Sequence, residues 1–281
     1  MQISVSHKGA ELTSIVANGR EYLWQGDSAF WGRRAPILFP IVGKLADDKL
    51  RINGHEYTMK QHGFARDTEF AERDGWYVLT GNGRENYPYA YELSVKYIID
   101  DNTLTCNWLV TNRSDETMLF QIGAHPAFLL PDYDVKDAFH GYVQCYDVDN
   151  NIVSPIVFSS LVNGLRVHYS QPKVLLNEKG ILALTNTTFA DDAILIEAQQ
   201  VAKVTLFDKQ GKRVLTVSCP QADAFGLWAP NKPGCPFVCI EPWCGIADKA
   251  GFKGDISERD CIYSLEPNEI FDFSYSITCN L

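Results

Sequence analysis

The feature that most constrains this chain is an apolar alternation with a period of two residues, repeated from one end to the other. It recurs in LRING and HEYTMK, in YELSVKYII and TLTCNWLVT, in VAKVTLF and KRVLTVSC, and in IFDFSYSIT. Such alternation is typical of strands that bury one face. The joints carry turn residues, with Asn53-Gly54 suited to a type I′ turn and Asp101-Asn102 between two long segments. We therefore expect hairpins and mostly antiparallel sheets.

Helical periodicity is not sustained over several turns anywhere in the sequence, and only short segments such as residues 135–139 are compatible with a helix. The sequence also lacks a blade repeat of about 40 residues and a low-complexity linker. One large sandwich of two packed sheets is favoured over a propeller or two separable domains. We expect an all-β protein in which residues 1–281 form a single domain.

Composition restricts the class of partner. The 281 residues are 46% hydrophobic, enough for a substantial core, and the formal net charge of -10 disfavours nucleic acid and anionic lipid. No apolar run approaches the roughly 20 residues that span a bilayer, and the N-terminus does not resemble an export signal. We expect a cytoplasmic monomer or homodimer that binds a small molecule, with its eight cysteines as free thiols.

Two ionisable side chains interrupt otherwise apolar segments. His125 lies in FQIGAHPAFLLP, and Glu241 lies in PFVCIEPWCGIAD, directly before a proline and a tryptophan. A carboxyl group at the end of a buried strand should have a raised pKa, which suits a general acid or base near neutral pH. The alternatives are a core histidine with both ring nitrogens satisfied and a glutamate paired with an arginine.

Two further segments carry candidate binding residues. WGRRAPILFPIVGKL contains Arg33, Arg34 and Lys44, which suit the orientation of sugar hydroxyls or, alternatively, a charged surface beside an edge strand. KQHGFARD contains His62 and Arg66, and the glycine after the histidine permits a sharp bend or a close approach of a ligand. The alternative for this second segment is an ordinary loop.

Other chemistries find little support. Cys235, Cys239 and Cys244 are close in the sequence but lack the paired spacing of common zinc sites. The sequence has no dinucleotide-binding fingerprint, no nucleophile elbow and no Walker lysine motif. We therefore expect neither a metal nor an organic cofactor.

Six segments in order along the chain resemble the aldose 1-epimerase superfamily, particularly its bacterial LacX-like branch. They are RRAPILFPIVGKL, QHGFARD, IGAHPAF, FADDAILIE, FGLWAP and FVCIEPWCG. Each motif is weak by itself, but the six together are specific. The resemblance implies a galactose mutarotase-like β-supersandwich with its active site in a cleft on the concave face of a large antiparallel sheet.

The resemblance also implies roles for individual residues. By motif, His125 is the general acid that protonates the ring oxygen of a sugar, and Glu241 is the general base for the anomeric hydroxyl. His62 corresponds to a second histidine that hydrogen-bonds the sugar. The aspartate that binds sugar hydroxyls corresponds to Asp192, with Asp191 as the less favoured match.

The family's arginine has more than one possible match in this sequence. Arg33 is the first choice, whereas a looser alignment places Lys44 there, which would replace a bidentate fork with a point charge. Trp228, Trp243 or Phe64 would supply aromatic walls that desolvate the carboxylate and stack on the sugar ring.

Together these residues predict a mutarotase that interconverts the α and β anomers of a hexose. The productive state should contain a cationic His125 and an ionised Glu241, because opening the ring requires one acid and one base. The alternatives are a hexose-6-phosphate 1-epimerase, a carbohydrate-binding module without activity and a glycoside hydrolase. A phosphate would need extra cations, for which the candidates are Arg33, Arg34, Lys44 and Arg66.

Overall fold

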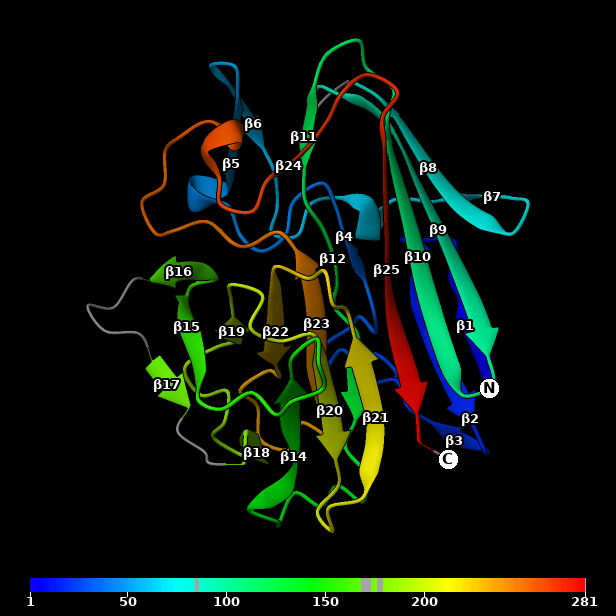
Figure 1. Cartoon of the computed structure of the whole chain (residues 1–281), viewed down its shortest axis with the longest axis vertical. Helices are drawn as coiled ribbons and strands as arrows, with labels where there is room; N and C mark the ends of the chain where they lie inside the picture. Colours follow the sequence, from blue (N-terminus) through cyan, green and yellow to red (C-terminus); the bar gives the residue numbers. More distant parts are fainter. Residues whose placement is uncertain (84–85, 168–172, 176–178, 281) are drawn as a thin grey trace.

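The chain is built almost entirely from β-strands, as Figure 1 shows for the computed structural model. The structure describes residues 1–83, 86–167, 173–175 and 179–280. Two nine-stranded sheets dominate these residues, and all the strand pairings in them are antiparallel. The prediction of an all-β protein with mostly antiparallel sheets is therefore confirmed.

The first large sheet, which we call sheet I, contains the longest strands. In spatial order these are β18 (Ile181–Thr185), β14 (Phe139–Tyr146), β20 (Lys203–Phe207), β21 (Arg213–Ser218), β25 (Ile270–Cys279), β10 (Thr103–Asn112), β9 (Ala90–Asp100), β8 (Trp76–Asn82) and β7 (Ala71–Arg73). Along β10 the residues alternate between half-buried and buried up to Val110. Sheet I therefore packs one face against the core, as the period of two predicts.

The second large sheet, sheet II, carries the candidate site. Its strands are β16 (Leu165–Val167), β15 (Ile156–Val162), β19 (Ile194–Ile196), β22 (Ala224–Trp228), β23 (Phe237–Cys244), β12 (Ile122–Ala124) and β4 (Ile37–Leu38), with β13 (Ala127–Leu129) paired to β23 and β17 (Lys173–Leu175) paired to β15. Figure 1 shows β23 near the middle of this sheet. Most of these strands are short, and loops connect them over the sheet.

Smaller elements complete the fold. They are the sheet of β1 (Gln2–Val5), β2 (Leu12–Ala17) and β3 (Arg20–Glu21), the pairs β5 (Lys49–Ile52) with β6 (His55–Thr58) and β11 (Met118–Phe120) with β24 (Tyr263–Leu265), and the 3₁₀ turns η1 (Ala46–Asp48), η2 (Ala65–Asp67) and η3 (Ile256–Glu258). The suggested helix at residues 135–139 is wrong. The Asp134 side chain instead accepts a hydrogen bond from the backbone N–H of Lys136, which favours a turn.

The predicted hairpin turns are confirmed. Asn53 and Gly54 join β5 to β6 with φ values of 49° and 81°, as a type I′ turn requires. Asp101 has a φ of 52° in the turn between β9 and β10, the most extensively paired hairpin of sheet I. Short polar side chains and glycine tolerate this left-handed backbone, so the local sequence fixes the turns.

Strand β23 is buried on both faces, which determines where a site can form. Val238 and Ile240 point into the main core between the two sheets. Phe237 and Cys239 belong to a separate cluster with the aromatic loop near Trp24, on the opposite face. Alternate residues of β23, starting at Phe237, therefore point away from sheet I and toward loops that cover this face. Glu241 lies on this loop-covered face.

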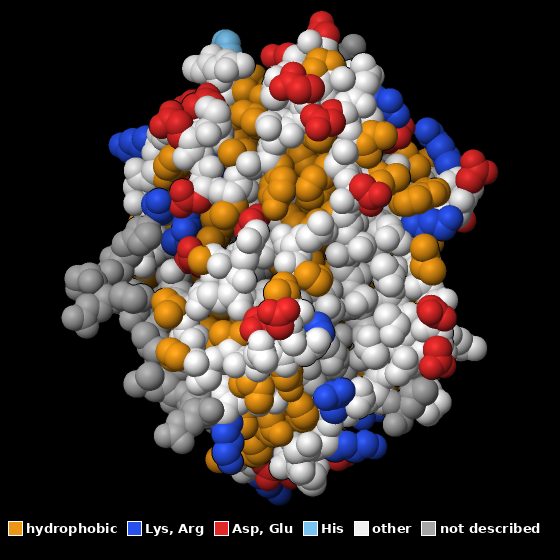
Figure 2. Space-filling view, viewed as in Figure 1, with side chains coloured by type: hydrophobic (Ala, Val, Ile, Leu, Met, Phe, Trp, Pro, Cys, Tyr) orange, Lys and Arg blue, Asp and Glu red, His pale blue; other side chains and the backbone are white. Residues whose placement is uncertain are grey.

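On the face shown in Figure 2, the described acidic and basic side chains are interspersed around hydrophobic ones. All eight cysteines are unpaired, as the sequence predicted. Within the residues that the structure describes, no helix is long and apolar enough to cross a membrane.

Candidate active site

Glu241 lies within β23, a strand whose eight residues are all buried. Its neighbour across the sheet, on β22, is Gly226. A Cβ atom at Gly226 would already contact the Glu241 side chain at 3.4 Å. Because glycine has no side chain, the space beside the carboxyl group stays open on that side of the sheet.

His125 lies between β12 and β13, two short strands that pair with the two ends of β23. The flanking pairs are Gly123 with Trp243 and Ala127 with Cys239. This antiparallel register places residue 125 opposite residue 241, and Nε2 of His125 lies 3.3 Å from Oε2 of Glu241. Strand pairing therefore brings together two ionisable groups that are distant in the sequence.

Several buried polar atoms around this contact have no hydrogen-bond partner among the described residues. They are Nδ1 of His125, Oε2 of Glu241 and Nε1 of Trp243. The histidine and the glutamate are close enough for an ion pair, but their alignment does not make a hydrogen bond. An unpaired buried polar atom costs roughly 1–3 kcal/mol, so such a concentration of them indicates groups arranged for a ligand.

Burial opposes charge on both members of the pair. It raises the pKa of the Glu241 carboxyl group well above its usual value, the nearby indole of Trp243 lowers this pKa in part, and the carboxylate of Asp192 raises it further. Burial also lowers the pKa of His125 to about 3, with further lowering by Arg66 and Arg33. The direction of the shift expected for the glutamate is confirmed. The lowered pKa of His125 does not favour the predicted cationic histidine at neutral pH.

His62 lies beside the pair on a sharply bent segment. Its φ is 66°, and a Cβ atom on the following residue, Gly63, would lie 2.1 Å from the carbonyl oxygen of Phe39. Only glycine fits there, which explains the His-Gly sequence. Nδ1 of His62 accepts a hydrogen bond from the backbone N–H of Gly43, and its Nε2 lies 3.3 Å from the side-chain amide nitrogen of Gln61. Its ring centre lies 5.5 Å from that of His125.

The candidate cations have different hydrogen-bond and ion-pair partners in the structure. Arg33 pairs with Asp67 at 2.9 Å, and Arg66 donates a hydrogen bond to the backbone carbonyl of Gln61 at 2.6 Å. Burial and the positive charge of Arg33 lower the pKa of Arg66 to about 10. The positive charges of both arginines lower the pKa of His125, and both arginines line one surface pocket with Trp31.

Arg34 and Lys44 have other neighbours. Arg34 lines the same surface pocket as Arg33 and Arg66, with its guanidinium group beside Gly26. The alkyl chain of Lys44 packs beside Gly164. Of the two neighbouring arginines, Arg33 is the one whose charge lowers the pKa of both His62 and His125.

Asp192 is the aspartate that faces the pair. It precedes β19 with a φ of 90°, and its carboxylate accepts a hydrogen bond from the backbone N–H of Ala193 at 2.8 Å. It is half-buried and raises the pKa of Glu241, whereas Asp191 is exposed. The structure thus distinguishes the two aspartates that the motif left as alternatives.

An aromatic residue that the sequence analysis did not select covers the histidine. The indole of Trp31 stacks on the His125 ring, with centroids 4.7 Å apart and planes at 26°. Trp228 meets His125 edge-on at 5.6 Å, so this expected wall lies at the site. Phe64 instead packs with Phe39 and Tyr91 on the core side, and the prediction of a wall there is wrong. The signal missed was Trp31, which precedes the arginine pair with one glycine between them.

Two hydrogen bonds from other segments hold the loop that carries Trp31. The indole N–H of Trp24 donates a hydrogen bond to the Trp31 carbonyl oxygen at 2.7 Å. The ammonium group of Lys232 donates another to the carbonyl oxygen of Ala29 at 2.9 Å. These bonds hold the indole over the imidazole.

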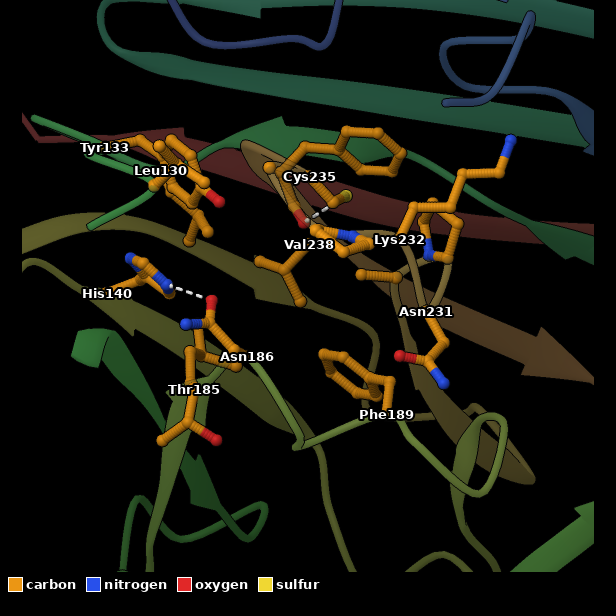
Figure 3. Close-up of a pocket in the computed structure, with 17 residues that line it drawn as sticks. Leu130, Tyr133, His140, Thr185, Asn186, Phe189, Asn231, Lys232, Cys235 and Val238 are labelled. Atoms are coloured by element: carbon orange, nitrogen blue, oxygen red, sulfur yellow. Dashed lines mark hydrogen bonds between the residues drawn. The ribbon is translucent and has the colours of Figure 1, made fainter. Parts of the chain in front are cut away.

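A separate cavity of about 190 Å³ lies beyond this aromatic cover. Figure 3 shows it between His140, Asn186 and Phe189 on one side and the segment around Lys232 and Cys235 on the other. Its lining includes neither member of the pair formed by residues 125 and 241. The proposed chemistry therefore does not lie in this cavity.

The fold and the site together define a β-sandwich protein with a buried histidine–glutamate pair, and the comparisons identify its family. The aldose 1-epimerase family model matches residues 1–278. The plasmid-encoded protein LacX of Lactococcus lactis subsp. lactis is 30% identical over 284 aligned positions, which cover 96% of this chain and 93% of LacX. The chain belongs to the aldose 1-epimerase family.

Solved structures show the same architecture. A galactose mutarotase related enzyme from Lactobacillus acidophilus has a TM-score of 0.87 and 31% identity, covering 99% of this chain and 94% of that one. A galactose mutarotase-like protein from Lactobacillus casei has a TM-score of 0.86 and 27% identity, covering 99% and 96%. The galactose mutarotase-like fold expected from the motifs is confirmed.

Proposed function

We propose that the protein is an aldose 1-epimerase that interconverts the α and β anomers of a hexose, with His125 and Glu241 as the proton-transferring pair. The observation that carries this proposal is the 3.3 Å approach of His125 Nε2 to Glu241 Oε2, at a buried place where polar atoms lack partners. Membership of the aldose 1-epimerase family supports the same reaction.

The separation of the two groups suits this reaction. The ring oxygen and the anomeric hydroxyl oxygen of a sugar are bonded to the same carbon, so an acid and a base that act on them must be neighbours. Glycoside hydrolysis usually needs two carboxyl groups about 5–9.5 Å apart, across a glycosidic bond. Here the glutamate lies 3.3 Å from an imidazole, which favours proton exchange at one carbon over hydrolysis.

The proton count of the pair is consistent with ring opening. When the pair holds one proton and that proton is on Nε2 of His125, the pair consists of an imidazolium and a carboxylate and has no net charge. The imidazolium then protonates the ring oxygen while the carboxylate accepts the anomeric hydroxyl proton. After rotation about the bond to the aldehyde carbon, the two transfers reverse, and the pair again holds one proton.

The surrounding residues fit a hexose. The indoles of Trp31 and Trp228 offer apolar faces for the C–H side of a pyranose. Nε2 of His62, which lies 3.3 Å from the side-chain amide of Gln61, would donate to a sugar hydroxyl, and the half-buried carboxylate of Asp192 would accept a hydrogen bond on the glutamate side. Donor and acceptor on different sides of the pair would fix the ring hydroxyls in one orientation.

A phosphorylated hexose is the second candidate substrate, because Arg33 and Arg66 lie close together on the His125 side. Each of them lowers the pKa of that histidine, and Arg33 lowers the pKa of Arg66. Two neighbouring guanidinium groups favour an anion. Replacing Arg33 with alanine should then weaken turnover of the phosphorylated sugar more than that of the free sugar.

Polarimetry tests the proposal directly. The protein should accelerate the mutarotation of freshly dissolved α-glucose, α-galactose or a hexose 6-phosphate above the rate in buffer. Comparing free and phosphorylated sugars separates the two substrate classes. Binding of sugars without any acceleration would contradict the enzymatic proposal and support a carbohydrate-binding protein instead.

A further inference from the structure

A thiol lies beside the proton-transferring pair. Cys239 precedes Glu241 by two positions on β23, so both side chains lie on the same, loop-covered face of the strand. A ligand atom from each of His125, Cys239 and Glu241 lies within 4.8 Å of the other two, and all three residues are buried. By spacing along the sequence this cysteine was grouped only with Cys235 and Cys244. Its neighbours in space, His125 and Glu241, could not be found from that spacing.

We propose that His125, Cys239 and Glu241 form a binding site for Zn²⁺ or a similar transition-metal ion, and that the bound ion blocks sugar turnover. Imidazole nitrogen, thiolate sulfur and carboxylate oxygen are the ligands that zinc takes in proteins, and three protein ligands leave a fourth position open. Zinc bonds of about 2.0–2.3 Å place neighbouring ligand atoms roughly 3.3–3.8 Å apart in a tetrahedral shell. The 3.3 Å between Nε2 and Oε2 already fits this shell.

The charges balance when a divalent ion binds. Burial and the nearby Glu241 raise the pKa of the Cys239 thiol well above its usual value, so the thiol holds its proton in the metal-free protein. Metal binding requires the thiolate, the carboxylate and the neutral imidazole, so any protons on the ligand atoms are released to solvent. The thiolate, the carboxylate and the neutral imidazole then neutralise the ion, so no uncompensated charge is buried.

Inhibition follows from shared atoms. The metal would occupy Nε2 of His125 and an oxygen of Glu241, the same atoms that move the proton in the proposed reaction. Only this second part of the inference rests on the proposed function. Binding itself is measured without any assay of activity.

Cobalt supplies the direct test, because a Co²⁺–thiolate bond gives a charge-transfer absorption in the near ultraviolet. Reduced, full-length protein is titrated with Co²⁺, and Zn²⁺ is then added to displace it. We expect one ion per chain and loss of the absorption when zinc is added. An absent thiolate band in the wild-type protein would overturn the proposal.

Variants locate the site. Cys239→Ser and Cys239→Ala should each abolish the charge-transfer band and weaken zinc binding at least tenfold, and the alanine variant avoids a buried hydroxyl. Cys244→Ser is the matched control, since Cys244 is a buried thiol of the same strand that belongs to the main core. Circular dichroism checks that each variant folds. A band that persists in both Cys239 variants contradicts the assignment.

Activity separates the two parts of the inference. If the wild-type protein is active, stoichiometric Zn²⁺ should suppress turnover, and a chelator should restore it. A protein that binds the metal but shows no epimerase activity contradicts the proposed function and leaves the metal site intact. An active protein whose turnover is unchanged by bound zinc overturns the inhibitory role.

Discussion

Two buried histidines in this molecule have closely similar surroundings. His125 stacks on Trp31 with ring centres 4.7 Å apart, and His140 stacks on Tyr133 at 4.6 Å. In both rings Nδ1 has no partner among the described residues. Burial, stacking and an unpaired nitrogen therefore do not distinguish a catalytic candidate from a structural histidine.

The partner of Nε2 makes the difference. In His125 it faces the carboxyl group of Glu241, whereas in His140 it lies 2.8 Å from the amide oxygen of Asn186. A carboxyl group can exchange a proton with imidazole, whereas the oxygen of an amide can only accept a hydrogen bond from it. The more open surroundings belong to His140, which lines the cavity in Figure 3. Proton-transfer capacity, rather than empty volume, identifies the candidate active site.

The largest expected effect comes from removing either member of the proton-transferring pair. Glu241→Gln and His125→Asn should each lower turnover at least about a hundredfold, within the range of general acid–base groups. His140→Asn should leave turnover within about twofold, because Nε2 of that ring is hydrogen-bonded to the Asn186 amide oxygen, outside the proposed site. Polarimetry on the three purified variants measures this, with circular dichroism as the control for folding. Full turnover in a folded Glu241→Gln protein would remove the glutamate from the mechanism.

The second effect concerns stability against acid. The pKa of His125 is lowered to about 3 from 6.5, so the unfolded chain binds the proton more readily in this interval. The free energy of unfolding that this pKa difference contributes is fully present above pH 6.5. It is lost as the pH falls toward 3, by up to about 1.4 kcal/mol per pH unit. His125→Asn should therefore lose less stability than the wild type between pH 7 and pH 5. Urea unfolding at both pH values measures the difference; equal losses would contradict the lowered pKa.

A smaller effect is expected from the stacked aromatics. Trp31→Ala should raise KM for the sugar about fivefold, which corresponds to about 1 kcal/mol of lost stacking. Tyr133→Ala removes the equivalent ring over His140 and should not change KM, because that ring does not face the pair. Initial-rate measurements over a range of sugar concentrations separate KM from kcat. A change in KM for the tyrosine variant alone would place the sugar in the other cavity.

The smallest effect on activity should come from giving His140 a carboxylate. Asn186 is exposed and its amide oxygen lies 2.8 Å from Nε2 of His140, so Asn186→Asp places a carboxylate beside that ring. Turnover, measured by polarimetry, should stay unchanged, because the new pair lies outside the proposed sugar site. A changed rate would instead indicate that His140 takes part in the reaction.

Local sequence was sufficient for much of the fold. Asn53-Gly54 and Asp101 mark their turns because their backbone angles are set within a few residues. The proposed helix at 135–139 failed because the Asp134 side chain caps a turn, a competition that periodicity does not register.

The site itself was only partly accessible from sequence. His125 and Glu241 were predicted because each interrupts an apolar segment. Their contact, however, depends on the register of β12 and β13 against β23. The same long-range pairing brings Cys239 beside them. Trp31 was missed because an indole in a loop has no periodicity, and its position depends on the bonds from Trp24 and Lys232.

The tethered Trp31 loop also bears on the fate of a reaction intermediate. Ring opening would produce a free aldehyde, which must rotate and reclose before it escapes or meets other nucleophiles. An indole held over the imidazole would retain the open-chain sugar and slow its exchange with bulk water. The strength of two hydrogen bonds to a loop backbone would then set how many opened sugars reclose on the protein and how many are lost as aldehyde.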